Sequence, residues 1–172
     1  MLLWQTSATS AEDVAALAAH AKGVAECLLR VDNTGSVILC EQGRAPKGVI
    51  EKRLTRLFSG GRFGPEAGPW LFLVGIWTPS DWNEEFRAWY QCEHAPMLLE
   101  CAEWSGFQLM EADARRGKQF YALHRLADRS ALDSAQRKRS RVTPWFKRLS
   151  KNKWFDGAFE RVLCHRSALL WR

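Results

Sequence analysis

The order of the elements predicted in residues 70–166 constrains the fold more than any other feature of this sequence. Residues 71–77 form an apolar run between two prolines, which is typical of a strand buried on both faces. Apolar side chains then recur at three- and four-residue spacing over residues 80–94, which predicts an amphipathic helix with Ser80 as its cap. Alternation over residues 107–112 and 119–126 predicts two strands joined by a polar turn at residues 115–118.

A second helical region and a last strand complete this part of the chain. Asp128 is suited to cap one helix, and the pair Thr143-Pro144 is suited to begin another. Residues 159–166 alternate again, so the order is β-α-β-β-α-β. This order predicts a ferredoxin-like antiparallel sheet with both helices on one face. A second sheet could cover the other face and leave a cavity shielded from water between the two sheets.

The N-terminal part of the chain follows a similar order. Strands are predicted at residues 2–6, 23–31 and 35–41, with helices at residues 11–21 and 47–58. This order, β-α-β-β-α, is the ferredoxin-like order short of one strand. It indicates that the chain could be a degenerate tandem repeat.

A glycine-rich stretch at residues 60–68 is the best candidate for a linker between the two parts. It divides the chain into residues 1–68 and residues 69–172, the second being a ferredoxin-like domain. Residues 1–68 are then either a degenerate ferredoxin-like half or an extension that decorates that domain. The sequence leaves both readings open.

The composition is that of a globular protein. The 172 residues are 47% hydrophobic, which is enough for a buried core, and the nine tryptophans could fill that core or line an apolar ligand cavity. No apolar run approaches the roughly 20 residues that cross a bilayer, and the first residues lack a secretory pattern, so we expect a cytoplasmic protein without membrane contact. The five cysteines are scattered without a CxxC pair, which favours reduced thiols over disulfides or a zinc site.

The net charge of +6 is concentrated in residues 129–153. Such a run could contact phosphates or an acidic partner, or it could be a solvated helix face. No RNA-binding motif, zinc finger or glycine-rich phosphate loop accompanies it, which argues against nucleic acid as a partner.

His94 is the first candidate for chemistry. It lies near the edge of the apolar face of its predicted helix, two residues before Pro96, which we expect to stop the helix and to leave the imidazole at the rim of a pocket. A histidine there can act as a general acid or base, or it can pack as a structural side chain. The neighbouring Glu93 could be a partly buried member of an ion pair or a second proton-transfer group.

Several short motifs in residues 70–166 have counterparts in one known group of proteins. The residues that carry them are Trp89, Tyr90, Glu93, His94, Pro96, Gly106, Phe107, Tyr121, Ala122, Leu123, Thr143, Pro144, Trp145 and Arg161. On these residues the chain resembles the EthD-like group of dimeric α+β barrel proteins. The resemblance implies a homodimer, with His94 beside a cavity between two sheets. The long N-terminal region departs from that pattern and could take the partner's place.

Similar barrels carry out several kinds of chemistry, so function has to be argued from the site. Our first hypothesis is a cofactor-independent enzyme that transfers a proton on a small apolar, cyclic or aromatic substrate, by isomerisation, dehydration or cyclisation. His94 would be the base and Tyr90 would donate a hydrogen bond to a developing enolate oxygen. Trp77, Trp89 and His124 would bind the substrate, although His124 could instead belong to the core between helix and sheet.

Two alternatives stay open. The first is a haem-binding or oxygenase-type barrel, in which His94 or His124 would be the axial ligand; no local cluster of residues supplies another metal site. The second is a non-catalytic protein that binds a small molecule or docks an acidic partner on its basic stretch. The sequence does not decide whether the protein is an enzyme, and it calls for no cofactor.

Overall fold

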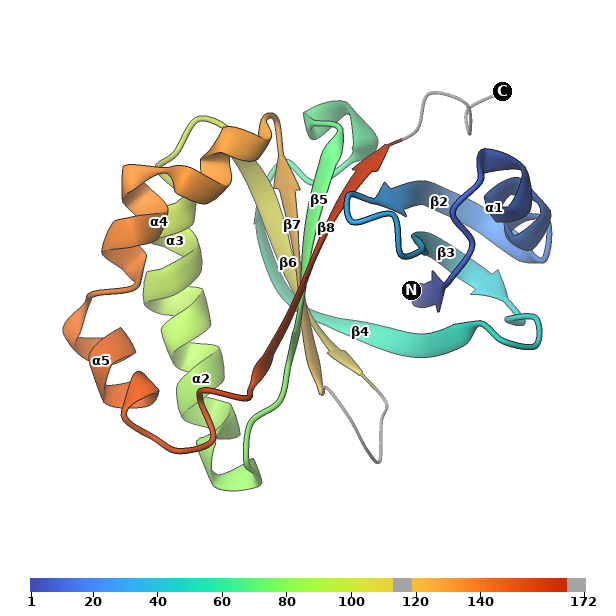
Figure 1. Cartoon of the computed structure of the whole chain (residues 1–172). Coiled ribbons are helices and arrows are strands. Elements are labelled where there is room, and N and C mark those ends of the chain that lie inside the picture. The colour runs from blue at the N-terminus through green and yellow to red at the C-terminus, as the bar shows by residue number, and fades with distance from the viewer. Residues whose placement is uncertain (113–118, 167–172) are drawn as a thin grey trace.

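Eight antiparallel strands close into one barrel in the computed structural model, which describes residues 1–112 and 119–166 (Figure 1). Around the barrel the order is β1-β3-β2-β8-β5-β7-β6-β4, and β4 pairs with β1 to close the ring. The strands are β1 (Leu2–Thr6), β2 (Ala21–Arg30), β3 (Ser36–Gly43), β4 (Ile50–Gly61), β5 (Trp70–Ile76), β6 (Trp104–Ala112), β7 (Phe120–Leu126) and β8 (Phe159–Arg166). The turn expected at residues 115–118 lies outside the described residues.

The helices cover two opposite sides of the barrel. They are α1 (Ala11–Ala18), α2 (Asn83–Trp89), a π-helical turn η3 (Tyr90–His94), α3 (Ala95–Leu99), α4 (Ala135–Ser140) and α5 (Pro144–Ser150), with short 3-10 turns between them. In Figure 1, α2 to α5 stand against β5 to β8 on the left, and α1 lies at the far right. No helix in the described part of the chain is both long and apolar enough to cross a membrane.

The caps of several helices agree with the sequence. The side chains of Ser10, Asp128 and Thr143 each accept a hydrogen bond from a backbone amide in the first turn that follows them. Ser80 does not cap a helix, because it begins a 3-10 turn that precedes α2.

The strand order is the same in both halves of the chain. Around the barrel the strands of the first half lie in the order β4-β1-β3-β2, and those of the second half lie in the order β8-β5-β7-β6, so in each half the fourth strand comes first, followed by the first, third and second. The second strand of each half pairs with the fourth strand of the other, as β2 with β8 and β4 with β6. The ferredoxin-like sheet predicted for residues 70–166 is therefore confirmed, and the same chain supplies the sheet that covers it. A homodimer is not needed to close this barrel, and both the homodimer and a domain boundary between residues 68 and 69 stay predictions.

The helix predicted at residues 47–58 is wrong, because these residues lead into β4 and form most of it. Leu54 and Phe58 are four residues apart, as on a helix face, but β4 gains backbone pairing on both sides, with β1 and β6. A bulge between Arg56 and Phe58 shifts the register. Leu54 therefore enters the barrel interior while Phe58 packs on the helix side. With β4 in place of the expected helix, the N-terminal half has all four strands of the ferredoxin-like order and lacks its second helix.

Apolar side chains fill the space between the two sheets. The residues buried there include Leu3, Leu28, Val37, Leu39, Leu54, Leu71, Leu73, Met110, Leu123 and Val162. The resemblance implied a cavity between the two sheets beside His94. Apolar side chains fill that space, so a cavity beside His94 has to lie elsewhere. That histidine belongs to a separate cluster, between the sheet of β5 to β8 and its helices.

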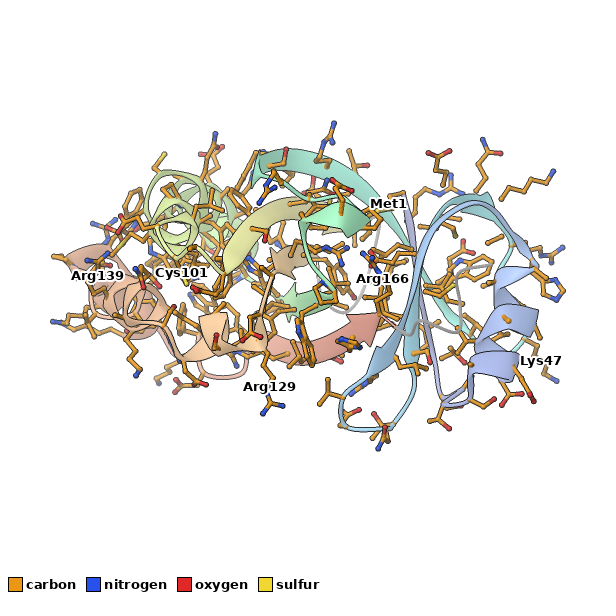
Figure 2. All side chains as sticks on the ribbon, turned by 90° about the horizontal axis from the view of Figure 1, so that it is seen from above. Met1, Lys47, Cys101, Arg129, Arg139 and Arg166 are labelled. Carbon is orange, nitrogen blue, oxygen red and sulfur yellow. The ribbon has the colours of Figure 1, made fainter. Side chains whose placement is uncertain are left out.

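A buried ion pair joins the two halves at one end of the barrel interior. Arg125 of β7 and Glu26 of β2 are 1% and 2% exposed, and Arg125 Nη1 lies 2.9 Å from Glu26 Oε1. Arg166 of β8 approaches the same carboxylate oxygen at 3.3 Å, and Figure 2 shows Arg166 where β8 reaches the N-terminal half. Arg125 also donates to the backbone carbonyls of Phe63 and Gly68, so the buried guanidinium is well satisfied.

Candidate functional site

The helix that carries His94 does not end at Pro96. It continues to Leu99, and the turn before the proline is π-helical. The amide of Ala95 donates to the carbonyl of Tyr90, five residues back, and this wider turn accommodates a proline that cannot donate a backbone hydrogen bond. The expectation that Pro96 stops the helix was therefore wrong. The same turn places the rings of Tyr90 and His94 with their centroids 5.2 Å apart.

A cavity of about 70 Å³ lies beside these two rings. Its wall combines side chains of the sheet with side chains of the helices and of the segment before β8. The lining residues are Phe72, Val74, Ile76, Trp89, Tyr90, His94, Leu98, Trp104, His124, Arg137, Arg141, Phe146, Phe155, Phe159 and Arg161. Because Arg141 and Arg161 are exposed while most of the aromatic residues are buried, the mouth of the cavity is at the arginines.

His94 presents an unused nitrogen to this site. Its Nδ1 is buried and has no hydrogen-bond partner among the described residues, and the ring also interacts with the backbone of Ser140, which favours the protonated ring. In the tautomer with the proton on Nε2, Nδ1 carries an open lone pair. Burial, with smaller contributions from the positive charges of Arg137 and Arg141, lowers the pKa of His94 to about 3, so the ring is neutral at pH 7.

His124, on β7, is held in one tautomer by its neighbours. The indole of Trp104 can only donate, and its Nε1 lies 3.1 Å from His124 Nδ1, so this nitrogen must accept. The ring proton is then on Nε2, which donates to the Tyr90 hydroxyl oxygen at 2.6 Å. Burial lowers the pKa of His124 and raises the pKa of Tyr90, so both groups are neutral. The hydrogen of the Tyr90 hydroxyl is thereby left for an acceptor other than His124.

Three arginines at the mouth form no salt bridge with the described residues. No carboxylate within residues 1–112 and 119–166 lies within salt-bridge distance of Arg137, Arg141 or Arg161. By contrast, Arg139 and Arg148, in the same basic stretch, pair with Glu100 and Glu85. Burial lowers the pKa of both Arg137 and Arg161, and the charge of Arg141 lowers both pKa values further. The charge of Asp133 offsets part of that of Arg137, and the mouth as a whole keeps an excess of positive charge.

The structure brings four of the five candidate site residues together: Tyr90, His94, Trp89 and His124 line the cavity. The fifth, Trp77, does not, because it follows β5 and is 41% exposed beside a different surface depression.

Glu93 forms no ion pair with any residue that the structure describes, and it does not line the cavity. Its carboxylate accepts hydrogen bonds from Trp89 Nε1 at 3.1 Å and from Thr143 Oγ1 at 2.5 Å, which ties the start of α5 to the helix that carries His94.

Sequence reasoning missed Trp104 and the three arginines of the mouth. Arg137 and Arg141 lay within the recognised basic run, but helical spacing did not show that they approach a strand residue, Arg161. Trp104 lies at the start of a strand, where no local pattern indicates that its indole would meet His124.

The residues of this site do not fit a haem. The unpartnered Nδ1 of His94 is a suitable donor atom. The cavity of about 70 Å³ opens to solvent at the arginines, so a small ligand can extend through its mouth, but a porphyrin is far larger than this space. In the described part of the chain, no group of three or more histidine, cysteine, aspartate or glutamate side chains could hold a metal ion.

The fold is shared with solved structures of low sequence identity. A monooxygenase-like protein from Listeria innocua matches with a TM-score of 0.63 and 15% identity, over 97% of this chain and 94% of the other. A heme-degrading enzyme from Listeria monocytogenes matches with a TM-score of 0.59 and 16% identity, over 97% of this chain and 100% of the other.

A third structure, also from Listeria monocytogenes, is a ferredoxin-fold protein related to antibiotic biosynthesis monooxygenases, with a TM-score of 0.59 and 16% identity, over 96% of this chain and 94% of the other. No family model and no curated protein matches the sequence. The comparisons support the α+β barrel fold, and the narrower EthD-like relationship stays a prediction.

Proposed function

We propose that the chain is a cofactor-independent enzyme that transfers a proton on a small, mostly apolar, cyclic or aromatic molecule bound in this cavity. The observation that carries the proposal is the buried His94 Nδ1, which has no hydrogen-bond partner among the described residues, beside a tyrosine hydroxyl whose hydrogen is not used by its neighbour His124. One group accepts a proton and the other donates a hydrogen bond, and both lie in a cavity with largely apolar walls.

In this mechanism His94 Nδ1 takes a proton from a carbon next to a carbonyl group. The electron pair of the broken C–H bond moves onto the carbonyl oxygen, and the Tyr90 hydroxyl stabilises the resulting enolate with a hydrogen bond. His94 then returns the proton to another carbon, which completes an isomerisation, or to a departing hydroxyl group, which completes a dehydration. His124 positions Tyr90, and Trp89 stacks on the His94 ring with centroids 4.5 Å apart.

Proton exchange on a simple ketone tests this proposal. Phenylacetone is incubated with the protein in D₂O, and the loss of its benzylic proton signal is followed by NMR. We expect faster exchange than in buffer, a loss of about 100-fold or more in His94→Gln, and a loss of about 100-fold in Tyr90→Phe. Cys92→Ser is the matched control, because Cys92 is an exposed residue of the same helical turn.

The outcomes separate the proposed enzyme from its alternatives. Equal exchange in wild type and His94→Gln would contradict the role of His94. Binding of phenylacetone with no exchange above buffer would instead indicate the non-catalytic small-molecule-binding protein.

A further inference from the structure

The arginines at the mouth of the cavity differ from the other charged residues around them. Arg139 lies on α4, as Arg137 does, and Arg148 lies on the next helix, α5. Each of these two arginines has a carboxylate partner. Among the residues that the structure describes, Arg137 has only the carbonyl of Leu132 as a hydrogen-bond acceptor. Since a guanidinium carries five N–H donors, most donors at the mouth face no acceptor in this part of the chain.

These arginines also adjoin the apolar wall. The guanidinium carbon of Arg137 lies 5.8 Å from the ring centroid of Phe72, and that of Arg161 lies 5.0 Å from the ring centroid of Phe159. The cations therefore border an aromatic surface that leads to His94, whose buried Nδ1 is a further polar group without a partner among the described residues. A ligand that fits this site has an anionic end for the arginines and a flat apolar body for the aromatic surface.

We infer that the cavity takes an anionic ligand, a small molecule with a planar apolar body and a carboxylate that binds Arg137, Arg141 and Arg161. This inference rests on the proposed small-molecule site. A carboxylate matches the planar guanidinium and can accept two of its hydrogen bonds at once. A cavity behind the arginines favours a small molecule over an acidic protein surface, which would cover the mouth and leave the cavity empty.

Such a ligand would also assist the proposed proton transfer. Arg137 and Arg141 are among the causes that hold the pKa of His94 low, and a bound carboxylate offsets their charge. The imidazolium formed during proton transfer would then be less disfavoured than in the empty site. The anionic group therefore contributes to catalysis as well as to binding.

Three probes of one shape but different charge test the inference. Benzoate, benzamide and benzamidinium are titrated into the whole protein by isothermal titration calorimetry. We expect benzoate to bind about tenfold more tightly than benzamide, since hydrogen bonds to a charged group are stronger than neutral ones, and benzamidinium to bind most weakly. Added salt should weaken the binding of benzoate and leave that of benzamide nearly unchanged.

The variants Arg137→Gln and Arg161→Gln should each lower the affinity for benzoate by about three- to tenfold and leave the affinity for benzamide unchanged. Arg139→Gln is the matched control. It removes the same charge from the same helix as Arg137→Gln, but Arg139 pairs with Glu100 and lies at the outer edge of the helical layer (Figure 2).

Each other outcome overturns a defined part of the argument. Equal binding of benzoate and benzamide would refute the anion site while leaving the proposed cavity intact. An equal loss of benzoate affinity in Arg139→Gln would show a general charge effect and would also refute it. If none of the three probes binds, the small-molecule cavity fails, and the anion inference fails with it.

Discussion

Mild acid should destabilise this protein through His94. Its pKa falls from 6.5 in the unfolded chain to about 3 in the folded one, so between these values protons bind the unfolded chain and not the native one. The unfolded state then holds more protons, which means that the free energy of unfolding falls as the pH falls. This contribution is complete above about pH 6.5 and is lost progressively toward pH 3.

The size of the effect follows from the two pKa values. At 1.36 kcal/mol per pKa unit, lowering the pH from 7 to 5 removes about 2 kcal/mol through His94 alone. Burial lowers the pKa of His124 as well, so this residue adds a loss of the same sign. A loss of this size is a large fraction of the stability of a single domain, which is about 5–15 kcal/mol.

The assay is urea unfolding at pH 7 and at pH 5, in wild type and in His94→Gln. Because the variant lacks the titrating ring, its free energy of unfolding should change by about 2 kcal/mol less between the two pH values, whatever its stability at pH 7. His20→Gln, at an exposed histidine, is the control and should behave as the wild type does. An equal pH dependence in wild type and His94→Gln would refute the argument.

Three further predictions concern the ion pair, the barrel interior and haem. Glu26→Gln should lower the free energy of unfolding by about 3–5 kcal/mol in urea, because it leaves Arg125 buried without its counter-charge; a change below 1 kcal/mol would contradict this. Leu73→Ala should cost about 2–5 kcal/mol but leave benzoate affinity unchanged, since Leu73 faces the barrel interior and not the cavity; calorimetry that shows altered affinity would argue against two separate cores. Haemin added to the protein should show an unshifted Soret band, and a shift that disappears in His94→Ala would overturn our exclusion of haem.

The sequence was sufficient for the fold where local pattern and tertiary pairing agree. The alternation of residues 119–126 places His124 and Arg125 on opposite faces of β7, as the structure does, but it left open which of the two faces packs against the helices. The failure at residues 47–58 has a physical cause, because the bulge breaks the alternation that indicates a strand: Leu54 and Phe58 are four residues apart, as on a helix face, but they face opposite sides of β4.

The site could be predicted only in part. Tyr90 and His94 lie four residues apart on one helix, so their proximity follows from local geometry. The side of the sheet that holds the cavity depends on how tightly Leu71, Leu73 and their neighbours fill the barrel interior, which no local pattern records. The approach of Arg161 to Arg137 depends on the pairing of β8 with β5, and sequence spacing contains no trace of it.

The pairing of β8 on both of its sides has a consequence for folding kinetics. This strand joins β5 to β2, and its residue Arg166 is paired with Leu28, far away in the sequence. Contacts between such distant segments form slowly, because the chain must lose much conformational entropy before they are made. The ring therefore cannot close on a growing chain until β8 has been synthesised. Phe159 and Arg161 of the same strand line the cavity, so the binding site is completed only at that step.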